Sequence, residues 1–504
     1  MKYFIFLFLI IFGTGCDLES GTNGTKEVKI EKNEILKVAL PYKARSFDPH
    51  INKDSATLAV TSQIYDTLFY LDDKGDLHPD LAESYEVLSD SDIILHIRKD
   101  VYFHNGDRLT SADVANSLIK TMESPVSKVI VSSIISVKDI GDDKVEIIHS
   151  CTPSMLLRHL SHASTAITKN IPSFRSGEED LTIVGTGPFK MEKWGNGENI
   201  RLASFDKYFD GASKIKELYF ETIPESSGRY IALETGEIDI AYDLLASDIK
   251  LANKNQKVNT IVRPSLGIDF VTINTHKITD KRVRQAIELG INKRDISAAV
   301  FEDMAKIAPS ILPPNVFGYD KDAAIKEYAP KRARELLKEA GYGNGLKLTV
   351  YIYDEPSRSQ MAQVIQGDLK NIGVDLSIET LEVSSFLQRT ANGEHDMLIG
   401  LWHMSTGDAD FGFYPLLHSS SIGAPGNRSF YSNPEVDELL DNARKEQDND
   451  KRADDYKKVQ KIISDDVPLF PISYKTYMIG ISKNVDGFIF SPSGNHVLYK
   501  VIKR

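Results

Sequence analysis

Helix start and stop signals alternate with short apolar runs along most of this chain, and this alternation limits the folds open to it. Thr110 and Asp113 form a capping box that predicts a helix through about Lys120. Another helix is expected to end at Gly373, and residues 374–378 then alternate apolar and polar residues as a strand does. No fixed-period repeat is present, which excludes solenoids and propellers. The sequence therefore predicts an α/β architecture.

The same reasoning predicts further elements. Pro at a first turn, Asn-Pro caps and closing glycines predict helices, and short apolar runs predict strands. The expected helices begin near 330, 360, 434 and 452, and the expected strands cover 93–97, 145–148, 347–352 and 396–400.

Length and charge narrow the functional classes. The 504 residues are 41% hydrophobic and 26% charged, enough for two or more domain-sized cores. A net charge of −12 argues against nucleic acid as a partner. The chain lacks H-E-x-x-H, G-x-S-x-G, P-loop and C-x-x-C patterns, so we expect neither an enzyme nor a cofactor. The scattered histidines do not suggest a site for a free metal ion.

The N-terminus resembles a lipoprotein export signal. Lys2 precedes the apolar run 3–12, and small residues 13–15 lead to Cys16. That run is about half the roughly 20 residues that cross a bilayer. We interpret 1–15 as a lipoprotein signal peptide and Cys16 as the lipidated residue, although Gly13 replaces the usual Leu of the bacterial lipobox. The alternative is an ordinary secretory signal with an incidental Cys16.

Residues 16–33 contain little to bury and are expected to form a flexible tether between the membrane anchor and the folded body. The second cysteine, Cys151, has no disulfide partner if Cys16 is lipidated. Because free cysteines are usually buried, we assign Cys151 to the core.

Several segments, in order, resemble one family across nearly all of the mature chain: the extracellular solute-binding proteins (family 5) of peptide and nickel ABC importers, which include dipeptide-, oligopeptide- and glutathione-binding proteins. The segments that carry this resemblance are 46–50, 63–68, 78–85, 96–107, 185–190, 280–287 and 430–437.

The resemblance implies a periplasmic-binding-protein-like fold, in which two lobes joined by two hinge crossings close on a ligand. It places the core of lobe 1 at 34–65, 173–273 and 480–504, with an extra subdomain inserted at 66–172. Lobe 2 is then 274–479.

A peptide ligand brings charged ends, and burying these requires opposite charges or hydrogen bonds. The loop 401–411 is the best-placed segment: family members that bind peptides carry an aspartate three residues after its tryptophan, which grips the ligand amine. Here Ser405 follows Trp402 at that spacing, so the resemblance leaves Asp408 or Asp410 as substitutes, with Thr406 beside them. Alternatively, these aspartates cap a helix near Phe411.

Two arginines are candidates for the ligand carboxylate, because guanidinium pairs with carboxylate in a bidentate manner. They are Arg428 in a Gly-rich loop and Arg358 near a helix start, and Arg358 is alternatively a solvated charge.

In lobe 1, Asp54 and Ser55 occupy the stretch where the family's ligand-contacting loop lies. Gly267–Phe270 is expected to be a strand edge that pairs with an extended peptide, or else Phe270 is simply core.

These inferences predict the substrate-binding lipoprotein of an ABC importer, a monomer in the cell envelope. It would capture small peptides, di-/oligopeptide or glutathione-like, and deliver them to its permease and ATPase. The alternatives are a binding protein for a nickel chelate and a peptide receptor without a transporter.

Overall fold

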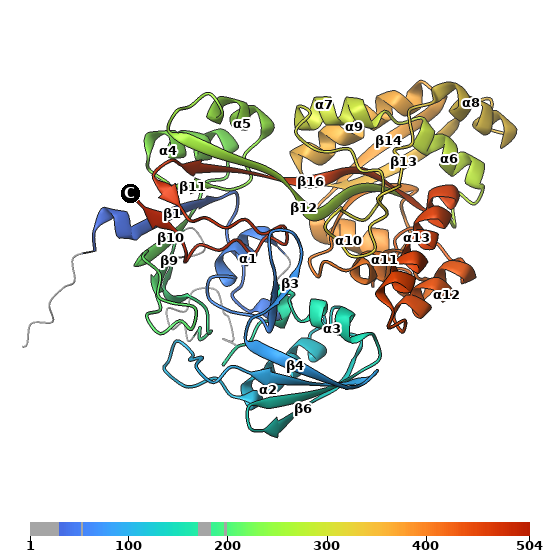
Figure 1. The fold of residues 1–504 in the computed structure, drawn as a ribbon. Coiled ribbons are helices and arrows are strands. Elements are labelled where there is room, and N and C mark those ends of the chain that lie inside the picture. Colours follow the sequence, from blue (N-terminus) through green and yellow to red (C-terminus); the bar gives the residue numbers. More distant parts are fainter. Residues whose placement is uncertain (1–29, 52–53, 170–182, 196–198) are drawn as a thin grey trace, which may run out of the picture.

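The architecture is α/β, with one long mixed sheet running through two lobes (Figure 1). The computed structural model describes residues 30–51, 54–169, 183–195 and 199–504. The order of the ten strands is β14-β13-β15-β12-β16-β11-β1-β10-β9-β8. The predicted signal peptide, Cys16 and most of the tether lie outside the described residues. No helix in the described ranges is long and apolar enough to span a bilayer.

Lobe 1 is built on the half of the sheet in which β1 runs parallel to β10 and β11. Its core packs apolar side chains of these strands against α1. Its strands and helices are β1 (Ile35–Leu40), β8 (Phe189–Gly195), β9 (Asn199–Ser204), β10 (Glu217–Thr222), β11 (Ile240–Ala241), β17 (Val485–Asp486), β18 (Ile502–Lys503), α1 (Ser55–Thr61), α4 (Ser226–Thr235) and α5 (Ala246–Ala252).

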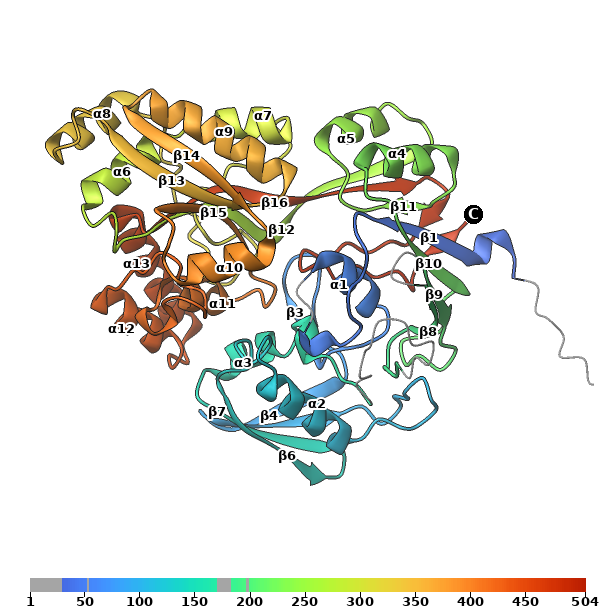
Figure 2. The same ribbon diagram turned by 180° about the vertical axis from the view of Figure 1, so that it is seen from behind.

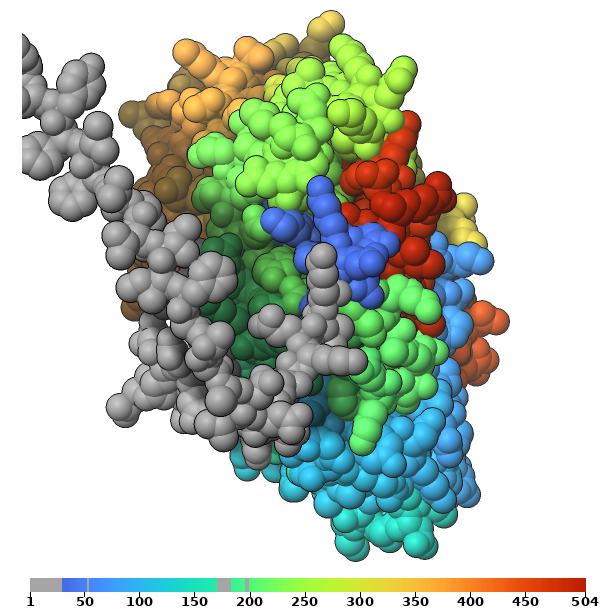
Figure 3. Space-filling model, turned by 90° about the vertical axis from the view of Figure 1, so that its left-hand side faces the viewer, coloured from blue at the N-terminus to red at the C-terminus, as the bar shows by residue number. Residues whose placement is uncertain are grey.

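The two ends of the described chain meet on lobe 1. Lys503 donates to the carbonyl of Ile35 at 2.9 Å and pairs with Asp239 at 2.8 Å. Figure 3 views this face, where the blue N-terminal and red C-terminal segments lie side by side.

Lobe 2 contains the other end of the sheet, where β13 runs parallel to β14 and β15. Helices cover both faces of this half, as parallel strands require (Figure 2). Its elements are α6 (Lys281–Leu289), α7 (Lys293–Phe301), α8 (Pro330–Glu339), β13 (Leu346–Tyr353), α9 (Pro356–Lys370), β14 (Val374–Leu381), α10 (Val383–Ala391), β15 (Met397–His403), α11 (Ala409–Leu417), α12 (Pro434–Ala443) and α13 (Asn449–Asp466).

Two long antiparallel strands, β12 (Val258–Ile273) and β16 (Leu469–Ser482), join the lobes. Their pairing shifts register between Pro264 and Ile268, which divides each strand between the two lobes. The second half of β12 pairs with β15 of lobe 2, so the crossing lies several residues before the boundary expected at 273. Within the described ranges, these strands are the two connections between the lobes (Figure 1).

The segment between β1 and β8 contains a separate four-stranded sheet, β4-β5-β7-β6, with its own core. The capping box at Thr110 and Asp113 is present and begins α2 as predicted. Cys151 is buried in this core, and burial raises the pKa of its thiol to about 11. The elements are β2 (Phe69–Leu71), β3 (Leu77–Pro79), β4 (Ala82–Ser89), β5 (Asp92–Ile97), α2 (Ser111–Glu123), β6 (Ile134–Gly141), β7 (Lys144–His149) and α3 (Pro153–His159).

This subdomain also contacts lobe 2. Arg158 of α3 donates to the carbonyl of Gly407 at 3.3 Å, and Leu71 of β2 and Leu77 of β3 pack in a core built mainly from lobe 2. The subdomain and lobe 2 are therefore in contact below the crossing strands (Figure 2).

Candidate functional site

A cavity of about 1290 Å³ lies between the lobes and is lined from lobe 1, the subdomain and lobe 2. Its size exceeds the roughly 300–1,000 Å³ typical of pockets for drug-sized ligands. Most of its lining side chains are apolar or aromatic. Six of the residues singled out from the sequence line it: Asp54, Ser55, Phe270, Trp402, Ser405 and Arg428.

The lobe 1 wall begins at the N-terminus of α1. Asp54 caps this helix, accepting hydrogen bonds from the backbone N–H and the hydroxyl of Thr57 at 2.8 and 2.9 Å. The hydroxyls of Ser55 and Tyr42 are 2.6 Å apart. Burial, with a further contribution from the charge of Asp243, raises the pKa of Tyr42 to about 12. This wall thus offers neutral hydroxyls and one carboxylate.

Trp402 lies near the end of β15 and forms part of an aromatic wall. Its indole N–H donates to the carbonyl of Phe411 at 2.8 Å, which fixes the ring orientation. The ring of Phe411 also lies 5.8 Å, centroid to centroid, from the ring of His162 in the subdomain. Lobe 2 and the subdomain therefore meet at this point of the cavity, through the rings of Trp402, Phe411 and His162.

Arg428 is the guanidinium that lines the cavity. Its side chain donates to the carbonyls of Gly423 at 2.7 Å and Ala424 at 3.4 Å, and within the described ranges it forms no ion pair. Burial lowers the pKa of Arg428. His395 bonds to the Arg428 carbonyl at 2.9 Å and holds the loop in place. A half-buried cation without a counter-charge is a suitable partner for an anionic group.

The structure places the two candidate aspartates away from the cavity. Asp408 is fully buried, caps α11 and accepts from Arg452 at 2.5 and 2.9 Å. Burial acts to raise the pKa of Asp408, but the charge and hydrogen bonds of Arg452, together with the N–H of Asp410, lower the pKa below its ordinary value. Asp410 is bound in the same bidentate manner by Arg444, at 2.7 and 3.0 Å. An arginine inside lobe 2 therefore balances the charge of each carboxylate. Asp408 has the helix-capping role that was the alternative to ligand binding.

Thr406 is buried next to these aspartates, and its hydroxyl accepts from the N–H of Asp408 at 3.3 Å. It does not line the cavity, unlike its neighbour Ser405. The loop thus presents the hydroxyl of Ser405 to the cavity, whereas its charged side chains, Asp408 and Asp410, are buried in lobe 2.

Arg358 also has an internal partner. It is buried at the start of α9, and it pairs with buried Asp269 of β12 at 2.5 Å and with Glu355 at 3.2 Å. It does not line the cavity. The carboxylates that pair with Arg358 therefore belong to the protein and not to a ligand.

The expected free strand edge at Gly267–Phe270 is not found. Strand β12 lies between β15 and β16, and its Ile268–Phe270 segment pairs with both. A side chain at Gly267 would approach Lys475, Ser265 and His403 to within 3.0–3.1 Å, so this position is also closely packed. Phe270 does line the cavity, although it is largely buried.

Several lining residues were not singled out from the sequence. They include Tyr42, the turn at 125–132 and residues of α10, namely Val383, Phe386 and Leu387. The apolar pair Val383 and Leu387, spaced i,i+4, was a usable sequence signal for an apolar helix face, although no helix was predicted there. Its direction toward the cavity depends on the packing of the lobes.

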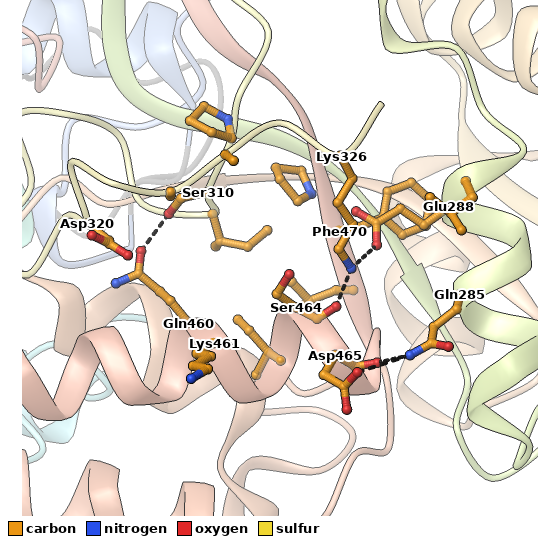
Figure 4. A pocket seen from close by; sticks show the side chains of 18 of the residues that line it. Gln285, Glu288, Ser310, Asp320, Lys326, Gln460, Lys461, Ser464, Asp465 and Phe470 are labelled. Carbon is orange, nitrogen blue, oxygen red and sulfur yellow. Dashed lines mark hydrogen bonds and ion pairs between the residues drawn. The ribbon is translucent and has the colours of Figure 1, made fainter. Parts of the chain in front are cut away.

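A second cavity of about 720 Å³ lies on lobe 2, outside the gap between the lobes (Figure 4). Its polar groups bond to one another: Ser310 donates to Gln460 at 2.6 Å, and Lys326 pairs with Glu288 at 2.8 Å. The described residues contain no group of three or more His, Cys, Asp or Glu side chains able to hold a metal ion. The cavity between the lobes is therefore the better candidate site.

Two lobes joined by two strand crossings, with a roomy cavity between them, define a protein that closes on a solute. Comparison with known proteins gives the family. The model of bacterial extracellular solute-binding proteins, family 5 (Middle), matches residues 76–424, and the chain belongs to this family.

Individual relatives cover almost the whole chain. The dipeptide-binding protein of Escherichia coli K12 is 28% identical, over 83% of this chain and 84% of that protein. Heme-binding protein A of Haemophilus influenzae is 26% identical, over 96% of both chains. The solved structure of the periplasmic binding protein DppA of Helicobacter pylori, in complex with the peptide STSA, aligns with a TM-score of 0.81 and 27% identity, over 93% of this chain and 98% of that one.

Proposed function

We propose that this chain is the substrate-binding lipoprotein of an ABC importer, which captures small peptides between its lobes and delivers them to a membrane permease. The ligands are di- or oligopeptides, or a glutathione-like peptide. The observation that carries the proposal is the cavity of about 1290 Å³, lined from both lobes and from the subdomain. A ligand that contacts all three favours the closed form by the difference between its affinities for the closed and open forms.

The chemistry of the cavity fits a peptide with a free carboxylate. Arg428 supplies a cation that no described carboxylate pairs with, and the hydroxyls of Ser405, Ser55 and Tyr42 line the same space. The conventional amine partner is absent at Ser405, and Asp54 is the one carboxylate among the described lining residues. We assign the ligand carboxylate to Arg428 and the ligand amine to Asp54.

Asp269 and Arg358 form an ion pair near this site, although neither side chain lines the cavity. Their ion pair joins β12 to the start of α9 and lies next to Gly400, whose carbonyl accepts from Arg358 at 3.4 Å. Gly400 lines the cavity but neither charged side chain does, so we assign the pair to the stability of lobe 2 and not to ligand contact.

The proposal includes the position in the cell. Lipidation at Cys16 would hold a monomeric binding protein at the outer face of the cytoplasmic membrane or in the periplasm, close to its permease and ATPase. This part rests on the sequence of the export signal. Permease and ATPase genes next to the gene for this protein would support import. If such genes were absent, a peptide receptor without a transporter would be favoured.

Isothermal titration of the purified mature protein tests the ligand class. Dipeptides, tripeptides, tetrapeptides and glutathione are titrated separately, with a nickel–histidine chelate and haem as comparison ligands. We expect saturable one-to-one binding of at least one peptide class. Binding of the chelate or haem, with no heat from any peptide, would overturn the peptide assignment and retain the solute-binding fold.

A further inference from the structure

Helix α10 presents two exposed apolar side chains to the cavity. Phe386 and Thr390 also line the cavity but are buried against lobe 2, where the Phe386 ring contacts Tyr353. Val383 and Leu387 lie one turn apart on another face and are 49% and 47% exposed. Both line the cavity between the lobes. The helix therefore uses one apolar face for the core and leaves another uncovered.

A second apolar wall comes from the turn that follows α2 in the subdomain. Val126, Val129 and Ile130 of this turn line the same cavity. The turn is fixed to lobe 1, because the hydroxyls of Ser124 and Ser127 both donate to the carbonyl of His50. This apolar wall is thus in place before any ligand binds.

Apolar side chains of these two walls and Leu401 of β15 line the same cavity, and we call this set the apolar annex. We define it by Val383, Leu387, Leu401, Val126 and Val129. It is continuous with the part of the cavity that contains Trp402 and Arg428. Exposed apolar surface that faces a ligand cavity gains free energy when an apolar group covers it.

The annex suits an apolar ligand group. No carboxylate belongs to it, and Lys128 of the turn, which also lines the cavity, has an exposed side chain that stays in contact with water. A charged ligand side chain placed against Val383 and Leu387 would lose water without gaining a charged partner from α10 in the cavity lining, whereas an aliphatic or aromatic side chain would cover both residues.

We propose that the annex binds a bulky apolar side chain of the peptide, so that this protein selects peptides with leucine- or phenylalanine-like residues over peptides of glycine. The inference rests on the proposed function, because it assumes a peptide whose carboxylate lies at Arg428. It adds a chemical preference that is set by α10 and the turn at 125–132.

Isothermal titration with trileucine and triglycine tests this preference. We expect the wild-type protein to bind trileucine at least about tenfold more tightly, since one well-placed apolar group provides that much discrimination. The double variant Val383→Thr, Leu387→Gln should bring the two affinities to within about threefold, mainly by weakening trileucine binding.

Leu251→Gln is the matched control, because Leu251 is a 49% exposed leucine on helix α5 of lobe 1, outside the cavity. It should leave the ratio of the two affinities unchanged. Equal affinities in the wild-type protein, or an unchanged ratio in the double variant, would overturn the annex while peptide binding stands. No binding of either peptide would overturn the annex, and titration with the wider series of peptides and glutathione then tests the proposed function separately.

Discussion

Replacing Asp408 with alanine separates a structural role from a ligand-binding role. The carboxylate is buried and bidentately bound by Arg452, whose side chain is 1% exposed. Removing one partner of such a pair leaves an uncompensated buried charge, at a cost of about 3–5 kcal/mol. The lost helix cap of α11 adds about 1 kcal/mol. We expect Asp408→Ala to lower the free energy of unfolding by about 4–6 kcal/mol.

Circular dichroism during thermal unfolding of the ligand-free protein measures this effect. For a lobe of about 200 residues, a loss of this size lowers Tm by roughly 10–20 °C. The double variant Asp408→Ala, Arg452→Met should regain most of the loss, because it removes the unpaired charge and keeps an apolar side chain in place.

At a temperature where Asp408→Ala remains folded, its affinity for peptide should match that of the wild-type protein, because the carboxylate does not line the cavity. An unchanged Tm with a large loss of affinity would refute the reasoning, since it would place Asp408 on the ligand.

Four further predictions follow from the same structure. Arg428→Ala should weaken binding of peptides with a free carboxylate by about 2 kcal/mol or more, and equal losses for the matching carboxamides in titration calorimetry would contradict the assignment. Arg358→Ala should leave affinity largely intact but lower the unfolding free energy by about 3–5 kcal/mol, because its carboxylate partner stays buried; a Tm within 2 °C of wild type would count against this. Burial lowers the pKa of His395 to about 4 and that of His496 to about 3, below the unfolded value of 6.5. Stability from these neutral side chains is therefore complete above pH 6.5 and is lost as the pH falls toward 4, by about 1.4 kcal/mol per histidine per pH unit, and flat unfolding midpoints between pH 7 and 5 would disagree. Cys16→Ala should abolish incorporation of radiolabelled fatty acid and release the protein from membranes, whereas unchanged labelling would exclude Cys16 as the lipidated residue.

The local structure followed from the sequence where short-range signals determine it. The capping box at Thr110 begins α2, Pro330 begins α8, and the alternating run after Gly373 is β14. Helix α9 begins at Pro356, before the expected start near 360, because a proline is well suited to a first turn. The family segments led to the two-lobed fold and the extra sheet.

The partners of the charged candidates were not predictable from the sequence, because they are distant along the chain. Asp408 pairs with Arg452, 44 residues later, and Arg358 pairs with Asp269, 89 residues earlier. The position of β12 between β15 and β16 is likewise a property of sheet order, which residue patterns do not give. Residue type identified groups able to bind a ligand, and only the packing shows which of them face the cavity.

Fluorescence of Trp402 offers the most direct test that the cavity between the lobes is the ligand site. The chain has two tryptophans, and Trp194→Phe leaves Trp402, which lines the cavity, as the single reporter. Titration of this variant with the peptides that bind in calorimetry should give a saturable change in emission with the same Kd. Calorimetric binding with no change in Trp402 emission would contradict a ligand enclosed between the lobes.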